Sequence, residues 1–252
     1  MGYNRCIVVI TLLCISCFVM SQNRYNEFLA QHKCKWGCVI SFPEKKVRFP
    51  KHSKNSMNHY FFYSNIASAK GPFPTFAGGP IVNIDNHCSV IMEDLRDISQ
   101  PHPELEMPID DNTLGQHKTW FEGIMLNNCN LPWGQIERRE EILNNDSLMR
   151  LINSAKNQYV RKSTSTALLN ATNTDCIYIV KIPNVGMITC RDKSYNKIIK
   201  KHTECYGVDF YRVNRYKPIS MMVFIDSNIV KTIDDYVEEI SRYIRFDEDF
   251  KF

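Results

Sequence analysis

The alternation of apolar and polar positions predicts strands in both halves of the chain. The clearest is residues 176–182, followed by a turn over 183–186 and a second strand over 187–190. Residues 81–92 hold two short apolar runs on either side of Asp85 and Asn86, which predicts a β-hairpin that turns there. Further segments with a strand pattern are 39–42, 59–63, 120–125 and 221–225.

Apolar residues at helical spacing predict three helices, each preceded by a capping residue. Asp146 precedes a helix whose apolar stripe is Leu148, Met149, Leu151 and Ile152. Ser194 precedes a second, with one face made of Tyr195, Ile198, Ile199 and His202. Thr232 precedes a C-terminal amphipathic helix whose inward residues are Ile233, Val237, Ile240 and Ile244.

Glycine, proline and short polar residues divide the chain. Turns are predicted at 71–74 and 78–80, an exposed acidic loop at 98–116, and a polar linker at 157–174. We therefore expect an N-terminal α+β region over 22–156, the linker, and a strand–helix–strand–helix module over 175–252. The predicted fold class is α+β: an antiparallel sheet packed by a few helices and stapled by disulfides.

The first 21 residues have the pattern of a signal peptide. Arg5 is followed by an uncharged apolar run from Cys6 to Met20, shorter than the roughly 20 residues that span hydrocarbon. Val19 and Ser21 are small residues at the positions that a signal peptidase reads, which predicts cleavage after Ser21. The product is then secreted and extracellular, with no stable membrane insertion. The alternative is a short signal anchor that keeps the protein on a membrane.

Composition favours a folded protein, because 44% of residues are hydrophobic and 12% aromatic. The formal net charge of +4 is too small to argue for nucleic acid by itself. The charges are unevenly placed: segments 33–54 and 181–217 are basic, and 93–111 is acidic. These runs are either solvated surface or a basic face for an anionic partner such as RNA, a glycan or a host surface.

Three of the ten cysteines precede the predicted cleavage site, which leaves seven as disulfide candidates: Cys34, Cys38, Cys88, Cys129, Cys176, Cys190 and Cys205. Oxidation in the secretory pathway should pair most of them. Because seven is odd, one thiol stays unpaired or links two chains into a dimer. Cys190 and Cys205 flank the second predicted helix, so a bridge between them is the pairing we favour. Asn145 and Asn170 begin glycosylation sequons.

The sequence offers no strong catalytic or metal motif. His32 stands near Cys34 and Cys38, but no second pair at zinc-ligand spacing follows. His202 is expected to be a packed residue of the core or of its boundary, and no nearby carboxylate accompanies His59 to form a general acid–base pair. No hydrolase serine motif, zinc-protease motif or phosphate-binding loop is present. We therefore predict no catalytic residue, no metal and no cofactor.

Two stretches carry a resemblance to a known family. The run from Gly186 to Cys190, followed by Ser194, Tyr195, Ile198 and Cys205, resembles the opening module of small T1-type fungal ribonucleases. It also resembles the secreted candidate effectors of powdery-mildew fungi, which share that fold. Residues 73–85 and 88–91 resemble the sheet of the same family. Ile188 stands where the family has an aromatic residue, and the opening module comes late in this chain.

The resemblance implies a ribonuclease-T1-like core. Active members use a glutamate, a histidine and an arginine, and none of the three can be placed on a matching position here. We therefore expect a secreted, non-enzymatic, effector-like protein that binds host RNA or protein through its basic segments. The alternatives are an active secreted ribonuclease and a signal-anchored viral or parasite surface glycoprotein.

Overall fold

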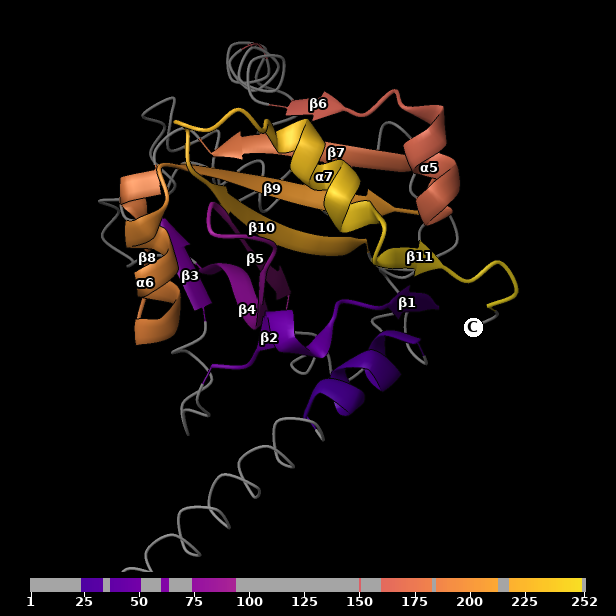
Figure 1. Cartoon of the computed structure of the whole chain (residues 1–252), viewed down its shortest axis with the longest axis horizontal. Helices are drawn as coiled ribbons and strands as arrows, with labels where there is room; N and C mark the ends of the chain where they lie inside the picture. The colour runs from indigo at the N-terminus through magenta and orange to yellow at the C-terminus, as the bar shows by residue number, and fades with distance from the viewer. Residues whose placement is uncertain are drawn as a thin grey trace, which may run out of the picture.

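The computed structural model describes residues 24–33, 37–50, 60–63, 74–93, 150, 160–182, 185–212 and 218–250. Nine strands of these segments form one sheet, and its pairings are all antiparallel (Figure 1). The order is β6-β7-β9-β10-β5-β4-β3-β8, with β2 paired to β4 off this path. A second, two-stranded sheet pairs β1 with β11.

The strands are β1 (Cys38–Ile40), β2 (Val47–Arg48), β3 (Tyr60–Tyr63), β4 (Pro74–Asn83), β5 (Cys88–Glu93), β6 (Val160–Lys162), β7 (Cys176–Ile182), β8 (Ile188–Cys190), β9 (Glu204–Tyr211), β10 (Ile219–Ile225) and β11 (Ile244–Phe246). The described part also contains four helices: residues 24–33, α5 (Thr166–Thr172), α6 (Lys193–Lys201) and α7 (Ile233–Ser241). Two 3₁₀ turns complete it, η1 (Glu44–Lys46) and η5 (Val185–Met187). The α+β class with an antiparallel sheet is therefore confirmed.

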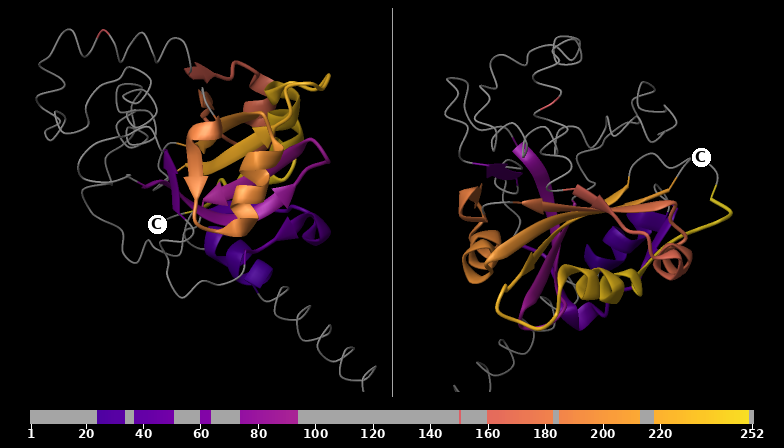
Figure 2. Two further views of the ribbon diagram at one scale, coloured as in Figure 1. Left: turned by 90° about the vertical axis from the view of Figure 1, so that its left-hand side faces the viewer. Right: turned by 90° about the horizontal axis from the view of Figure 1, so that it is seen from above.

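The sheet is buried on both faces, because alternate residues of its strands enter two different cores. In β10, Met221 and Val223 join the larger core, whereas Met222 joins the smaller one. The larger core contains the inner side of α7, and the smaller core contains that of α6. Figures 1 and 2 show α7 lying across β7 and β9, and α6 beside β3 and β8 at one end of the molecule.

The predicted hairpin over 81–92 is confirmed, with β4 and β5 joined by bends at residues 85–87. The predicted turn at 78–80 is wrong, since these residues lie inside β4. The β4–β5 register shifts between Gly78 and Ile81. A bulge of this kind tolerates glycine and proline, so residues that usually break a strand stand within one here.

Two helix predictions need correction at their ends. The second predicted helix starts at Lys193, and its cap is Asp192, whose carboxylate accepts hydrogen bonds from the backbone N–H groups of Ser194 (2.6 Å) and Tyr195 (3.4 Å). The C-terminal helix does begin after Thr232, which forms a capping box with Asp235. Ile244 is buried as predicted, but it belongs to β11 and not to that helix.

The stretch predicted as a linker is structured from residue 160 onward. It forms the edge strand β6 and helix α5, whose N-cap is Ser165. Leu168 and Leu169 are the partly buried apolar residues that α5 packs against the larger core, and most of its other residues are exposed. A short helix at the edge of a core needs few apolar residues, which explains why its composition resembles a linker. Strand β10 pairs with β5 on one side and β9 on the other, so one sheet spans the predicted domain boundary.

No disulfide joins any of the five cysteines in the described part of the chain to another: Cys38, Cys88, Cys176, Cys190 and Cys205. The predicted Cys190–Cys205 bridge is therefore not present. Both side chains enter the smaller core, but they come from β8 and β9, which are separated in the sheet by β10, β5, β4 and β3. Burial in this core raises the pKa of the Cys190 thiol to about 11, and it raises the pKa of the Cys205 thiol well above its usual value.

Several predictions fall outside the described residues. These are the signal peptide at 1–21, the loop at 98–116, the strand at 120–125, most of the helix after Asp146, the thiols of Cys34 and Cys129, and the sequon at Asn145. The sequon asparagine Asn170 is described and is exposed on α5. None of the described helices has both the length and the apolar character to cross a bilayer.

Candidate functional site

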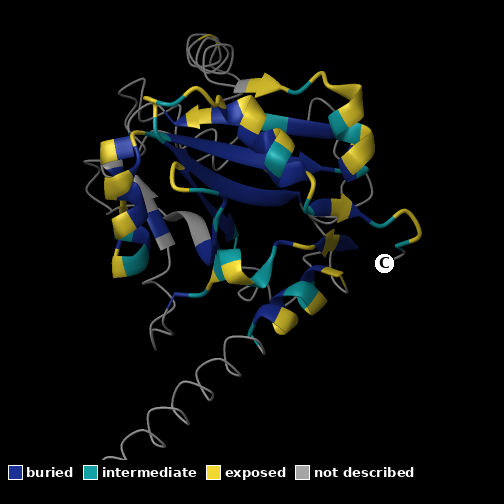
Figure 3. Cartoon of the chain, viewed as in Figure 1, coloured by how far each residue is buried: buried dark blue, intermediate teal, exposed yellow. Residues whose placement is uncertain are grey.

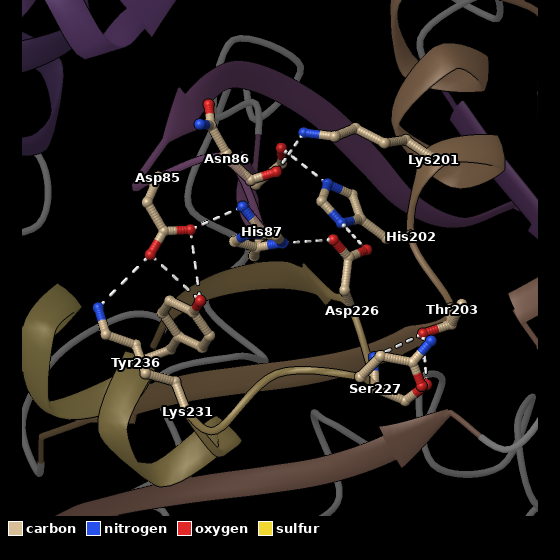
Figure 4. Close-up of polar contacts among 12 residues, drawn as sticks. Asp85, Asn86, His87, Lys201, His202, Thr203, Asp226, Ser227, Lys231 and Tyr236 are labelled. Atoms are coloured by element: carbon tan, nitrogen blue, oxygen red, sulfur yellow. Dashed lines mark hydrogen bonds and ion pairs between the residues drawn. The ribbon is translucent and has the colours of Figure 1, made fainter.

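The candidate site lies where the β4–β5 turn, the end of α6 and the end of β10 meet (Figure 4). Strand β10 is antiparallel to β5, and its last residue Ile225 is the register partner of Cys88, the first residue of β5. The residues just beyond the two strands, Asp226 and His87, are therefore neighbours. The Asp226 N–H donates to the carbonyl of His87 at 3.2 Å, which extends the ladder by one bond.

The carboxylate of Asp226 contacts two imidazoles. Its Oδ1 lies 2.9 Å from Nδ1 of His202, the residue that ends α6, and its Oδ2 lies 3.0 Å from Nδ1 of His87. On the far side of its ring, Nε2 of His202 lies 3.1 Å from the hydroxyl of Ser89 in β5. We call Asp226, His202, His87 and Ser89 the Asp226 cluster.

Burial differs across the Asp226 cluster. The side chain of His202 has no exposed surface, that of Asp226 is 23% exposed and that of His87 is 54% exposed. Ser89 is 2% exposed. One histidine is therefore a core residue, and the other is a surface residue bound to the opposite oxygen of the same carboxylate.

Burial also sets the protonation of the cluster. Desolvation of the imidazolium outweighs the hydrogen bond and the charge of Asp226, so the pKa of His202 lies below its usual value. Desolvation would raise the pKa of Asp226, but the hydrogen bonds of His87 and His202 outweigh it and hold that pKa below its usual value. At neutral pH a neutral His202 thus donates from Nδ1 to the Asp226 carboxylate and accepts at Nε2 from Ser89.

The hydrogen-bond order from Ser89 through His202 to Asp226 is that of a serine hydrolase triad. Two features separate it from a working triad. Ser89 is buried, whereas a nucleophile must reach its substrate. Ser89 also lies within β5, paired with Phe224 of β10 and Asn83 of β4, and not on an exposed strand-to-helix turn. Ser89, His202 and Asp226 instead form a polar link between β5, the end of α6 and the end of β10.

A second polar group lies beside the cluster and holds the same turn from the other side. The hydroxyl of Tyr236 in α7 donates to the carboxylate of Asp85 at 3.2 Å, and the Lys231 ammonium lies 3.4 Å from it. Lys231 also bonds to Glu239 of α7 at 3.1 Å. Figure 4 shows Tyr236 and Lys231 on the Asp85 side of the turn, with His202 and Asp226 on the other side. The turn is therefore fixed to both α6 and α7.

Backbone groups complete the fixation of the α6 end. The ammonium of Lys201 donates to the Asn86 carbonyl at 2.5 Å. The hydroxyl of Thr203 accepts from the Ser227 N–H at 2.7 Å. These contacts close the last turn of α6 against the ends of β5 and β10.

His202 was expected in the core or at its boundary, and the structure buries it, but its partners Asp226, His87 and Ser89 were not predicted. A usable signal was present, because Asp226 directly follows a predicted buried strand and His87 lies in a predicted hairpin turn. Pairing those two strands would have brought both residues together. His32 is also buried, with Nδ1 2.9 Å from the Phe28 carbonyl, and no group of three or more metal-ligating side chains occurs within the described segments.

Comparison of the chain with models of protein families, with curated proteins and with solved structures finds no match in any of the three.

Proposed function

We propose that the chain is a secreted, non-enzymatic interaction protein of the effector type, built on a ribonuclease-T1-like core, which binds host RNA or a host protein. The observation that carries this proposal is the burial of His202 and Ser89 within the Asp226 cluster. These are the groups that acid–base or nucleophilic chemistry at this triad-like arrangement would use, and they are covered by protein and bind one another. Such a cluster stabilises a scaffold, and a scaffold with basic segments suits a binding role.

The basic segments offer the contact surface. In the first of them, Lys33, Lys45 and Arg48 are exposed. Cationic side chains at the surface attract anionic partners and raise the rate of encounter. The apolar residues of the sheet are used in the two cores, so a partner meets mainly polar and charged side chains on the described surface.

The test is to incubate purified residues 22–252 with labelled structured RNA and to follow cleavage and binding together across a salt series. Salt-sensitive binding without cleavage supports the proposal, and weaker binding by a Lys33→Gln/Lys45→Gln/Arg48→Gln variant would place the contact. Cleavage would contradict it and favour an active ribonuclease. If the protein neither binds nor cleaves the RNA, the search should turn to protein partners.

Secretion is tested separately by sequencing the N-terminus of material released from expressing cells. A start at Gln22 supports the proposed signal peptide. An intact N-terminus on membrane-bound material would favour the anchored surface glycoprotein.

A further inference from the structure

The outer side of α6 carries a row of cations. Lys193, Lys197 and Lys200 are exposed, and they follow one another at spacings of four and three residues, which places them on one side of the helix. The opposite side holds the buried residues Tyr195 and Ile198. Figure 3 shows exposed positions recurring along α6 at the edge of the molecule. We call these three lysines the α6 lysine row.

The helix that carries the α6 lysine row is held in place by contacts along its buried side and at both ends. The Tyr195 hydroxyl donates to the Gly79 carbonyl of β4 at 2.6 Å, and its ring centroid lies 5.0 Å from that of Phe61 in β3. Asp192 caps one end of the helix, and His202 is fixed at the other. At a rise of about 1.5 Å per residue, the row spans about 10 Å.

The nearby carboxylates of the described segments do not neutralise the row. Asp192 accepts two backbone hydrogen bonds, Asp226 is bound by two histidines, and Glu204 is bound by Lys181 at 3.0 Å and Tyr206 at 2.8 Å. No ion pair within the described part involves Lys193, Lys197 or Lys200. The charge of the row is therefore directed to solvent.

Apart from its lysines, α6 presents few groups that could recognise a ligand. Its N-terminal amides are occupied by Asp192, so an anion cannot bind at the helix end. The side chain of Asn196 is bound to the backbone N–H and carbonyl of Cys190. The aromatic ring of α6, Tyr195, is buried and cannot stack on a base. A partner must therefore be recognised by the density of its negative charge, without reading of bases.

We propose that the α6 lysine row binds a sulfated polysaccharide. Lysine is a compact cation on a flexible stem without the fork geometry of arginine, which suits sulfate groups at varied spacing. The choice of an extracellular polymer as the ligand rests on the proposed secretion. The presence of a cationic surface on α6 does not depend on that proposal. Binding there would hold the protein on sulfated surfaces while its other basic segment stays open to a partner.

The experiment is elution of the purified protein from immobilised heparin with a salt gradient, followed by solution titration with heparin. A Lys193→Gln/Lys197→Gln/Lys200→Gln variant should elute at lower salt and bind heparin at least about tenfold more weakly at 0.1 M salt. The slope of the logarithm of its binding constant against the logarithm of salt concentration should be smaller in magnitude by about 2–3. A variant with the same charge loss elsewhere, Lys33→Gln/Lys45→Gln/Arg48→Gln, should change each value less. Replacing the three lysines of the row with arginine should retain most of the affinity, which controls for misfolding.

Two results would overturn the inference. One is equal loss of heparin affinity in the two glutamine variants, which would indicate attraction by net charge alone. The other is double-stranded RNA displacing heparin at equal charge concentration in a manner that depends on the row, which would make the ligand a nucleic acid. Cleavage of RNA or an uncut N-terminus would contradict the proposed function. Neither result would change the heparin affinities expected for the parent and its variants.

Discussion

His202 and Asp226 lie 2.9 Å apart, Nδ1 to Oδ1, with the imidazole wholly enclosed by protein and the carboxylate close to solvent. The pKa of His202 is lowered by this burial, so below about pH 6.5 the unfolded chain takes up a proton that the folded chain does not. The free energy of unfolding should consequently fall as pH drops below that value. The lowered pKa of Asp226 adds a further loss once pH falls below about 4.

Replacement of His202 by glutamine isolates its share of this pH dependence. At pH 8 the variant should be less stable than the parent by about 1–3 kcal/mol, because Asp226 and Ser89 lose a buried partner. The difference should narrow at pH 5, where the parent has lost the contribution of neutral His202. Urea unfolding at the two pH values measures it. A constant difference would show that His202 does not titrate in this way, and the exposed His87→Gln variant, expected within about 0.5 kcal/mol of the parent, is the control.

The buried thiols should be unreactive until the protein unfolds. Cys88 and Cys205 lie in the sheet with their pKa values raised, chiefly by desolvation, which leaves almost no thiolate at pH 8. Native protein should therefore label slowly with iodoacetamide at these positions, and denatured protein should label fully without any reductant. Mass spectrometry of the peptides reports both results. A Cys190–Cys205 peptide pair that labels only after reduction would restore the disulfide predicted from the sequence.

Gly78 leaves room for the contact between α6 and the sheet. A Cβ atom at this position would lie 2.7 Å from Cε2 of Phe61 and 2.8 Å from Cζ of Tyr195, closer than packed carbons approach. Gly78→Ala should thus cost about 1–3 kcal/mol by overpacking, measured by thermal or urea unfolding. Gly186→Ala, at an exposed glycine without positive φ, should change stability by less than about 0.5 kcal/mol. Equal effects at the two glycines would contradict the packing described for α6.

The capping box of α7 should be worth a measurable part of the stability. Thr232 accepts from the Asp235 N–H, and Asp235 in return accepts from the Thr232 N–H at 2.6 Å. Thr232→Ala should cost about 0.5–2 kcal/mol, and Thr232→Ser should restore most of it. Thr166→Ala, at an exposed residue in the first turn of α5, is the matched control and should have little effect. A silent Thr232→Ala variant would mean that α7 is fixed by its buried side alone.

Local patterns predicted the elements whose apolar residues alternate or recur without interruption. Strands β7 and β10, the β4–β5 hairpin and α7 all follow from their own residues. Strand β9 was missed, because Gly207 and Asp209 interrupt its pattern although both are buried in the sheet. The helix at residues 24–33 was missed as well, because its pattern of apolar residues is short. Tyr25 and Phe28 are the buried residues that fix it in the larger core.

The candidate site depends on pairing, which a single pattern does not contain. His87 and Asp226 are 139 residues apart in the chain, and they meet at His202 only because β5 begins where β10 and α6 end. A disulfide was expected from proximity along the chain, but sheet order separates β8 from β9. Local patterns thus indicate single strands and helices, whereas the neighbours of each strand depend on the order of the sheet.

The position of β10 has a consequence for how the protein is made. Residues 219–225 leave the ribosome late, yet they complete the sheet between β5, made early, and β9, made shortly before. Until then the β4–β5 hairpin has an open edge that can pair with another chain. The last segment, β11, likewise closes on β1 near the beginning. A ribosome-stalled or truncated product that stops before β10 would therefore expose this edge, and newly made chains should need a chaperone until β10 has been made.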